Sequence, residues 1–354
     1  MKRIGLLRDD RYLEHVPGPS HVESPERLTA IHQAIDSEFK PDEMVLIEPR
    51  PATFEELTWN HLPEYVRTIQ ATKDIKQYMA LDPDTVTCPE SYNVARLAVG
   101  GLISAIDALI ANDIHGAMCL VRPPGHHAEP DRAMGFCLFN NIALGAHYCR
   151  KVHGLQRCLI VDFDLHHGNG TQKSFYRDPT VLYFSTHQYP YYPGTGAAGE
   201  VGAGEGKGFT VNCPLPAGCT DQDYAAIFRE ILCPIATEFD PDIVLVSAGM
   251  DIYWQDPLGG MQVTEKGISA ISRALIDVAK ECSSGRIIFV LEGGYSKEGL
   301  SRGVVSIIKQ LMEREDDRTD IREARSLMEA ASPRASKNSI KMAIEAQKAF
   351  YSCF

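Results

Sequence analysis

Six short runs of apolar residues limit the folds open to this chain more than any other feature of its sequence. Each run is continuous rather than alternating, and several are rich in β-branched residues, a pattern typical of strands covered on both faces. A parallel sheet between two layers of helices provides that cover. The runs are Ala117–Val121, Cys158–Val161, Val181–Phe184, Phe209–Asn212, Ile243–Ser247 and Ile287–Leu291.

Helical patterns separate these runs, and the alternation predicts an α/β fold with a mainly parallel sheet and right-handed crossovers. Asp221 and Thr264 are the expected N-caps of two of the helices. The predicted helices cover Ser91–Ile110, Asn141–Lys151, Asp221–Glu238 and Thr264–Cys282.

No repeat, Ser/Gly-rich linker or low-complexity tract divides the 354 residues, so we predict one large domain over residues 1–354. The glycine-dense stretch Gly194–Gly208 indicates a long loop. The strongly charged segment Glu313–Lys337 is expected to link the main body to a last helix at Ser339–Tyr351.

Net charge, apolar runs and cysteine spacing limit what this protein can bind and where it can reside. A net charge of −12 disfavours nucleic-acid binding, which needs clustered Lys and Arg, and fits a cationic substrate better. The N-terminus shows no signal peptide and no run of about 18 apolar residues occurs, so we expect a cytoplasmic protein without a membrane span. The ten cysteines form no CxxC pair, which predicts reduced thiols rather than a cysteine-held metal.

Chemically reactive side chains follow four of the predicted strands. In open α/β sheets the ligand binds beyond the carboxyl ends of the strands, so we expect these side chains to share one rim. They are His126 and His127, then Asp162, Asp164 and His166, then Asp251, and finally Tyr295.

Asp164 and His166 are two residues apart, so at an extended strand end they point to the same side. With Asp251 as a third ligand they would form a catalytic zinc site that keeps one position open for water. A two-metal cluster is the alternative, in which Asp162 would serve as a bridging ligand.

The adjacent histidines of RPPGHHAEP lie in a predicted loop, where both could reach one pocket. A histidine with a pKa near neutrality could take a proton from a metal-bound water and then give it to a departing amine. Asp162 and Asn169 are the candidates to orient the second ring nitrogens of His126 and His127. Tyr295, in LEGGYS, could donate its hydroxyl hydrogen to an oxyanion.

Six motifs occur in a recognisable order: RPPGHHAEP, GFCLFNN, DFDLHHGNGTQ, SAGMD, DPLGG and LEGGY. With them the sequence resembles the histone deacetylase superfamily, in its class II and bacterial deacetylase-like branch, from about residue 4 to at least residue 310. HVESPERL, which begins at His21, is similar to the N-terminal motif of that branch. The resemblance implies an arginase/deacetylase fold with a central eight-stranded parallel sheet flanked by helices.

The resemblance also implies roles for the residues of the rim. Asp164, His166 and Asp251 would bind zinc, His127 would be the general base and acid, and His126 its electrostatic partner. Asp162 and Asn169 would orient the two histidines, the asparagine being the class II-like form. Tyr295 would polarise the substrate carbonyl, and a tyrosine rather than a histidine at that position implies an active enzyme.

The same resemblance implies a narrow acyl-lysine tunnel. Phe136 and Tyr192 would form its walls, and the carbonyl of Gly135 would accept a hydrogen bond from the substrate. Leu258 follows Asp256-Pro257, where a polyamine-selective relative tends to carry an acidic gatekeeper, so it favours acetylated lysine in proteins or peptides over acetylated polyamines.

Two structural potassium sites are further implied. One would use Asp162, Asp164, His166, Ser185 and Thr186, and the other backbone oxygens near Phe175, Asp178, Val181 and Phe209.

Several alternatives stay open at the level of sequence. An acetylpolyamine amidohydrolase would use the same chemistry on another amine. A non-catalytic acyl-lysine binder would keep the pocket, and an arginase-like hydrolase would share the fold but hold two manganese ions. Ferrous iron suits the ligands as well as zinc does. The oligomeric state, possible homo-oligomers included, is likewise open.

Overall fold

The computed structural model describes residues 3–354 and contains an eight-stranded sheet in which every neighbouring pair of strands is parallel. The strand order is β2-β1-β5-β10-β9-β6-β7-β8, so neighbours in the sheet are often distant in the chain. The strands are β1 (Ile4–Leu7), β2 (Met44–Ile47), β5 (Ala117–Cys119), β6 (Cys158–Asp162), β7 (Val181–Gln188), β8 (Thr210–Leu215), β9 (Ile243–Ala248) and β10 (Ile287–Leu291). A separate antiparallel pair joins β3 (Met79–Ala80) to β4 (Val86–Thr87).

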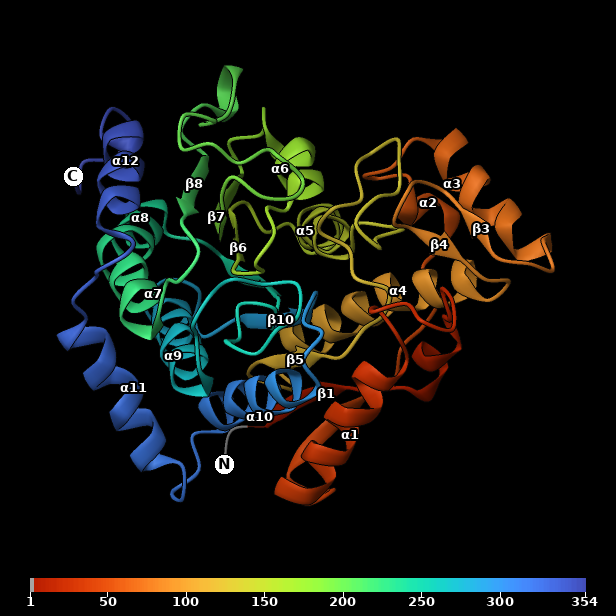
Figure 1. Cartoon of the computed structure of the whole chain (residues 1–354), viewed down its shortest axis with the longest axis horizontal. Helices are drawn as coiled ribbons and strands as arrows, with labels where there is room; N and C mark the ends of the chain where they lie inside the picture. The colour runs from red at the N-terminus through yellow and green to blue at the C-terminus, as the bar shows by residue number, and fades with distance from the viewer. Residues whose placement is uncertain (1–2) are drawn as a thin grey trace.

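Helices surround the sheet (Figure 1). They are α1 (Glu26–Glu38), α2 (Phe54–Leu57), α3 (Pro63–Ala71), α4 (Ser91–Ile110), α5 (Asn141–Lys151), α6 (Asn169–Phe175), α7 (Asp221–Ile227), α8 (Cys233–Phe239), α9 (Glu265–Cys282), α10 (Lys297–Met312), α11 (Arg318–Ala330) and α12 (Lys337–Gln347). Helices α1, α10, α9 and α11 pack successively against one another, and α4 packs against α5. The predicted α/β fold is therefore confirmed.

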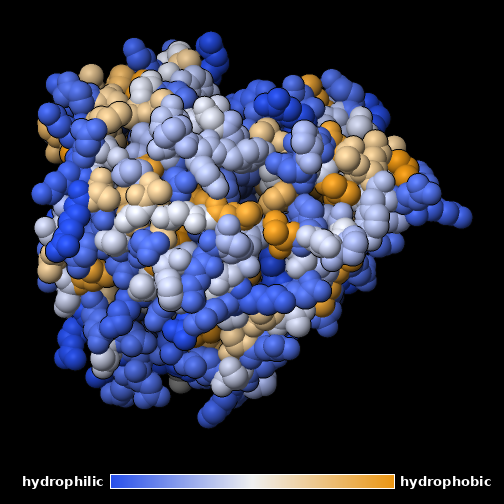
Figure 2. All heavy atoms as spheres, viewed as in Figure 1, coloured by the Kyte–Doolittle hydropathy of each residue, from blue (hydrophilic) through white to orange (hydrophobic). Residues whose placement is uncertain are grey.

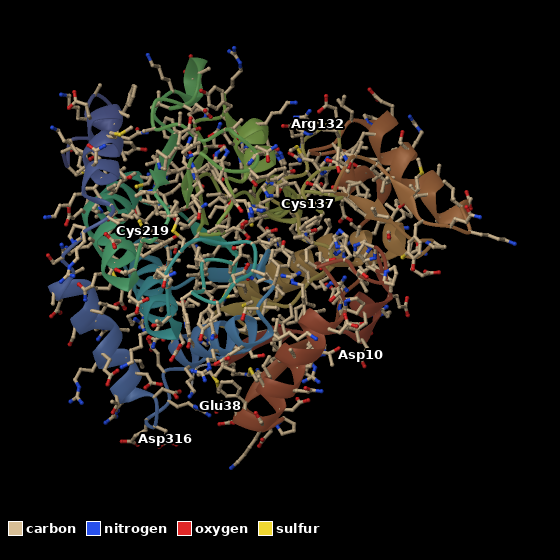
Figure 3. All side chains as sticks on the ribbon, viewed as in Figure 1. Asp10, Glu38, Arg132, Cys137, Cys219 and Asp316 are labelled. Carbon is tan, nitrogen blue, oxygen red and sulfur yellow. The ribbon has the colours of Figure 1, made fainter. Side chains whose placement is uncertain are left out.

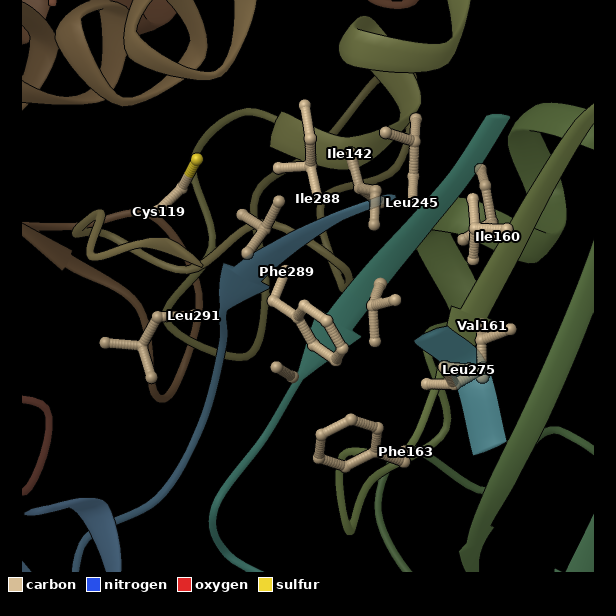
Figure 4. Packing of buried hydrophobic residues seen from close by; sticks show 14 of the residues in the cluster. Cys119, Ile142, Ile160, Val161, Phe163, Leu245, Leu275, Ile288, Phe289 and Leu291 are labelled. Carbon is tan, nitrogen blue, oxygen red and sulfur yellow. The ribbon is translucent and has the colours of Figure 1, made fainter. Parts of the chain in front are cut away.

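The core shows why the apolar runs are continuous. Ile160, Leu245 and Ile288 are partners across β6, β9 and β10, and they lie on the same side of the sheet as Ile142 of α5 (Figure 4). Their chain neighbours Val161 and Phe289 lie on the opposite side, where α9 packs (Figure 4). Every residue of these three strands is buried, so neither face of the sheet is open to solvent there.

Several predicted boundaries need correction. Thr220, not Asp221, is the N-cap of α7, because Asp223 in the first turn accepts hydrogen bonds from the backbone N–H and hydroxyl of Thr220. The predicted helix Asp221–Glu238 is interrupted by a π-helical turn over Phe228–Leu232. Thr264 caps α9 as predicted, and its hydroxyl accepts from the N–H of Lys266.

The charged segment 313–337 is not simply a link, because helix α11 occupies residues 318–330. Its polar residues face outward while a narrow stripe, with Ala324 buried, packs on α9. The sparse apolar positions are easily overlooked in a sequence where charge dominates. The final helix, α12, packs against β8 at one edge of the sheet.

Hydrophilic residues cover most of the face shown in Figure 2, and hydrophobic residues gather in a band across its middle. Among residues 3–354, helix α4 alone has the length and apolar composition that could cross a membrane. About two thirds of it, 67%, is buried inside the protein, where it packs against α5 and β5. A helix buried in a protein core can have the same length and apolar composition, so these two properties alone are weak evidence for a membrane span.

Candidate metal and catalytic site

A cavity of about 220 Å³ opens at the carboxyl ends of the central strands. The loop after β9, in cyan at the centre of Figure 1, forms part of its surroundings beside β10. Asp162, Asn169 and Asp251 are buried behind the lining, each in contact with a histidine that reaches the cavity. The predicted residues that line it are His126, His127, Gly135, Phe136, Asp164, His166, Tyr192, Leu258 and Tyr295.

Asp164, His166 and Asp251 each offer one ligand atom, and these three atoms lie within 4.8 Å of one another. The Nδ1 atom of His166 lies 3.2 Å from Oδ1 of Asp164 and 3.1 Å from Oδ2 of Asp251. Backbone N–H groups hold the outer carboxylate oxygens: Gly293 donates to Asp164 and Leu165 donates to Asp251, each at 2.9 Å. The segments after β6 and β9 therefore supply the three ligands, and the segment after β10 holds one of them in place.

The electrostatics of this group fit a divalent cation. Burial and the nearby charge of Asp164 raise the pKa of Asp251 to about 7. Burial lowers the pKa of His166, but hydrogen bonds to Asp164 and Asp251 outweigh it and raise that pKa to about 10. Two buried carboxylates beside one imidazole make an excess of negative charge that a bound cation would relieve. The donor set, one nitrogen and two carboxylates, suits zinc and ferrous iron alike.

Asp162 takes no part in this group. Its Oδ2 accepts a hydrogen bond from the hydroxyl of Tyr183 at 3.1 Å and faces Nδ1 of His126 at the same distance. Its Oδ1 accepts from the N–H of Asp164. Within residues 3–354 the group of potential metal ligands comprises three residues, fewer than two adjacent metal ions would need, which disfavours a two-metal centre.

The adjacent histidines have different partners. The Nδ1 atom of His126 lies 3.1 Å from Asp162, a carboxylate, whereas that of His127 lies 2.8 Å from Oδ1 of Asn169, a neutral amide. Burial lowers the pKa of His126, but the charges of Asp164 and Asp162 outweigh it and raise the pKa to about 10. Burial and the positive charge of His126 hold the pKa of His127 well below its usual value. These opposite shifts favour a cationic ring at His126 and a neutral ring at His127.

Tyr295 reaches the same cavity from the loop after β10. Its ring lies 5.9 Å from that of Phe136, and the guanidinium of Arg27 stacks 5.1 Å from its centre. Its backbone N–H donates to Asp256 at 2.6 Å, which fixes the loop. Burial raises the pKa of Tyr295, so the phenol stays protonated and is available as a hydrogen-bond donor.

The predicted tunnel residues surround the opening. Gly135 has φ of +57°, and a Cβ atom there would lie 2.3 Å from Cδ2 of His127, so only glycine fits. The ring of Tyr192 stands edge-on to His127 with centroids 5.2 Å apart. The carbonyl of Leu258 accepts a hydrogen bond from the hydroxyl of Tyr191 at 3.0 Å, which joins two sides of the opening.

Several buried charged residues around the site were not singled out from the sequence. Glu292, the glutamate of LEGGY, accepts hydrogen bonds from the backbone of Gly125 and His126 and so fixes the histidine loop. Arg27 donates to the carbonyls of Glu292 and Gly294 and to the carboxylate of Glu23. Glu23 also forms a bidentate pair with Arg122. Their signal was their place inside recognised motifs.

Comparisons with known proteins agree with this geometry. The histone deacetylase domain family matches residues 21–311. A "Probable deacetylase" of Archaeoglobus fulgidus is 40% identical over 297 residues, covering 83% of this chain and 82% of that protein. The "Polyamine deacetylase HDAC10" of Mus musculus is 41% identical over 330 residues, covering 88% of this chain but 47% of that protein.

A solved structure described as "Crystal Structure of HDA15 HD domain" superposes with a TM-score of 0.91 at 34% identity, covering 99% of this chain and 95% of the other. The eight-stranded parallel sheet and the site at its carboxyl edge thus define an α/β protein of the arginase/deacetylase fold. The chain belongs to the histone deacetylase family, as its extent of match and its relatives show.

Proposed function

We propose that this protein is a zinc-dependent deacetylase that hydrolyses the amide of N-acetyl-lysine side chains to free amine and carboxylate. The observation that carries the proposal is the joint presence, in one cavity of about 220 Å³, of the ligand group, the two histidines and Tyr295. The zinc ligands would be Asp164, His166 and Asp251. Zinc, when bound there, polarises the amide carbonyl and acidifies its water.

The protein side chains perform the proton transfers. With Nδ1 of His127 engaged by Asn169, its Nε2 atom is left to take a proton from the attacking water. The low pKa of His127 keeps that atom unprotonated at neutral pH. The same nitrogen then donates the proton to the leaving amine. The hydroxyl of Tyr295 donates to the carbonyl oxygen as negative charge develops there.

His126 would remain cationic throughout, because Asp162 and Asp164 hold its proton. Its charge disfavours a second proton on His127 before reaction and offsets the carboxylates of the metal group. Phe136 and Tyr192 would exclude water along the acyl-lysine chain.

We also propose structural potassium at the two places implied by the family. Asp162 and Ser185 are register partners on β6 and β7, and the hydroxyl oxygen of Thr186 is buried without a hydrogen-bond partner. These oxygens support the first of the two potassium sites, the one that would use Asp162, Ser185 and Thr186.

A second candidate function is acetylpolyamine hydrolysis. Two observations favour it. The chain is 41% identical to a protein named as a polyamine deacetylase. The side chain of Asp84 also lines the cavity, where its carboxylate could face a cationic amine. Leu258 favours lysine, because an apolar side chain offers no counter-charge to a free ammonium group.

The deciding experiment compares kcat/KM on an acetyl-lysine peptide and on acetylputrescine, with enzyme loaded with zinc and with chelated enzyme. We expect activity only in the zinc-loaded enzyme and a preference for the peptide. Leu258→Glu should raise the relative rate on acetylputrescine, whereas Leu258→Gln, with similar shape and no charge, should not. Preference of the unmodified enzyme for acetylputrescine would establish the second function instead.

A further inference from the structure

A chain of hydrogen bonds runs from His127 to the protein surface. The Nδ2 atom of Asn169 donates to Oε1 of Glu129 at 2.9 Å. Glu129 in turn accepts from Arg132 at 2.9 Å and from Lys173 at 2.7 Å. The side chain of Glu129 is 8% exposed, while those of Arg132 and Lys173 are 61% and 49% exposed. Arg132 is labelled in Figure 3 on the same loop as the buried Cys137.

The surroundings of Asn169 determine which way its amide points. Three acceptors surround Nδ2: the carboxylate of Glu129, the carbonyl oxygen of His127 at 3.4 Å and the sulfur of Met134 at 3.2 Å. None of them carries a hydrogen when Glu129 is ionised. Rotating the amide by 180° would place its oxygen against all three.

The orientation of the amide determines the tautomer of His127. The Oδ1 atom of Asn169 can only accept, so Nδ1 of His127 must carry the hydrogen of their 2.8 Å hydrogen bond. In the neutral ring the lone pair then lies on Nε2. The opposite tautomer would present an N–H where the proposed reaction needs an acceptor.

Glu129 is the strongest of the three acceptors because it is charged. Burial raises its pKa, but hydrogen bonds from Arg132 and Lys173 outweigh burial, so the pKa lies below its usual value. The two surface cations thus keep Glu129 ionised while its Oε1 atom faces Asn169.

We propose that Glu129 is a positioning residue that orients the amide of Asn169 and, through it, holds His127 in the tautomer whose Nε2 accepts a proton. The inference rests on the proposed function in so far as His127 is the base of the reaction. The proposal also explains why an asparagine faces Glu129, because an aspartate at position 169 would place two carboxylates in direct contact.

A double-mutant cycle tests the proposal. Glu129→Gln replaces the carboxylate by an amide that can also donate, so we expect kcat on an acetyl-lysine peptide to fall at least about tenfold with little change in KM. Asn169→Asp alone should lower kcat as well, since it opposes Glu129. In the double variant the introduced glutamine can donate to the introduced aspartate, which again accepts from Nδ1 of His127, so kcat should recover above either single variant.

Asp131→Asn is the matched control. Asp131 shares Lys173 with Glu129 but forms no hydrogen bond with Asn169, so its loss should leave kcat within about twofold. If Glu129 only anchored the loop, the two substitutions of the cycle would act additively and the double variant would be the slowest. That additive result would overturn the proposal.

The second readout does not depend on catalysis. Nitrogen-15 NMR of histidine-labelled, zinc-free protein reports which ring nitrogen of His127 carries hydrogen, with His127→Asn used to assign its signals. We expect the Nδ1–H form in the unmodified protein and a loss of that preference in Glu129→Gln. An unchanged tautomer in the variant would refute the positioning role. Absence of deacetylation by the unmodified protein would refute the proposed function instead, and the NMR result would still stand.

Discussion

At the scale of a residue, His126 and His127 show how strongly neighbouring groups change the pKa of a side chain. They are adjacent, equally buried, and 4.0 Å apart between ring centres. The charges of Asp164 and Asp162 raise the pKa of His126 to about 10 despite its burial. Burial and the charge of His126 lower the pKa of His127, whose partner Asn169 carries no charge. One side chain type thus supplies a fixed positive charge and a neutral base.

Replacing Tyr295 by Phe removes one hydroxyl and should lower kcat by about 10²–10³-fold, because the developing oxyanion loses a preorganised donor. KM should change little. Tyr191→Phe is the control, since it removes a hydroxyl at the edge of the same cavity that donates to the carbonyl of Leu258. Steady-state kinetics measure both, and full activity in Tyr295→Phe would remove the assigned role.

Metal binding should be visible in thermal stability. Zinc at about 100 times its Kd should stabilise the chelated protein by roughly 2.7 kcal/mol, raising Tm. Asp251→Asn should abolish that increment while leaving the metal-free protein no less stable, because it removes one of two buried like charges. Asp256→Asn, which alters a carboxylate outside the ligand group, should retain the increment. A zinc-induced rise in Tm for Asp251→Asn would contradict the proposed ligand set.

At the scale of elements, single carboxylates join segments that are distant in the chain. Asp256 holds the backbone of Tyr295 and Ser296, and Glu292 holds that of Gly125 and His126. Asp223, in the first turn of α7, accepts from the N-cap Thr220 and also from the backbone N–H groups of Arg334 and Ser336 immediately before α12. In each case a loop or helix end obtains its conformation from another part of the protein.

Asp223→Ala should lower the free energy of unfolding by about 2–4 kcal/mol, since it removes the carboxylate that accepts from the N-cap Thr220 of α7 and leaves buried donors before α12 unpaired. Urea denaturation followed by circular dichroism measures the change. Asp320→Ala, on the exposed side of α11, should cost under about 0.5 kcal/mol. Equal effects of the two substitutions would show that Asp223 does not join the two helices energetically.

At the scale of the whole molecule, His61 joins the segment before α3 to the loop that carries His126 and His127. Its Nε2 atom accepts from the N–H of Asn140 at 2.9 Å, and Nδ1 donates to the carbonyl of Glu129 at 3.0 Å. Burial lowers its pKa from 6.5 to about 4. The folded protein therefore favours neutral His61, while the unfolded chain takes up a proton near pH 6.5.

The lowered pKa of His61 makes the stability of the folded protein depend on pH. The stabilisation is complete above pH 6.5 and is lost as the pH falls from about 6.5 to about 4, by up to about 3 kcal/mol. Asp251 and Glu292, with pKa values raised to about 7, oppose this trend. The test therefore compares urea unfolding of the unmodified protein with that of His61→Gln across this range. The unmodified protein should lose more stability; identical pH profiles would contradict the prediction.

Sequence patterns were enough to predict the α/β class, six of the eight strands of the main sheet and the reactive residues at their carboxyl ends. These properties are local: continuous apolar runs imply cover on both faces, and the two-residue spacing of Asp164 and His166 places them together at an extended strand end. The family resemblance added the number of strands and the roles of the site residues. That the chain forms one domain stays a prediction.

The order of the strands and the contacts between distant charged side chains could be seen only in the folded structure. Strands β1 and β2 are four residues each, too short for a clear periodic signal, and pairing with β5 makes β1 part of the sheet. Arg27 contacts Gly294 across 267 positions of chain, and Glu129 meets Asn169 across 40. Local propensity does not encode such contacts, because they form only when burial of both sheet faces brings distant segments together.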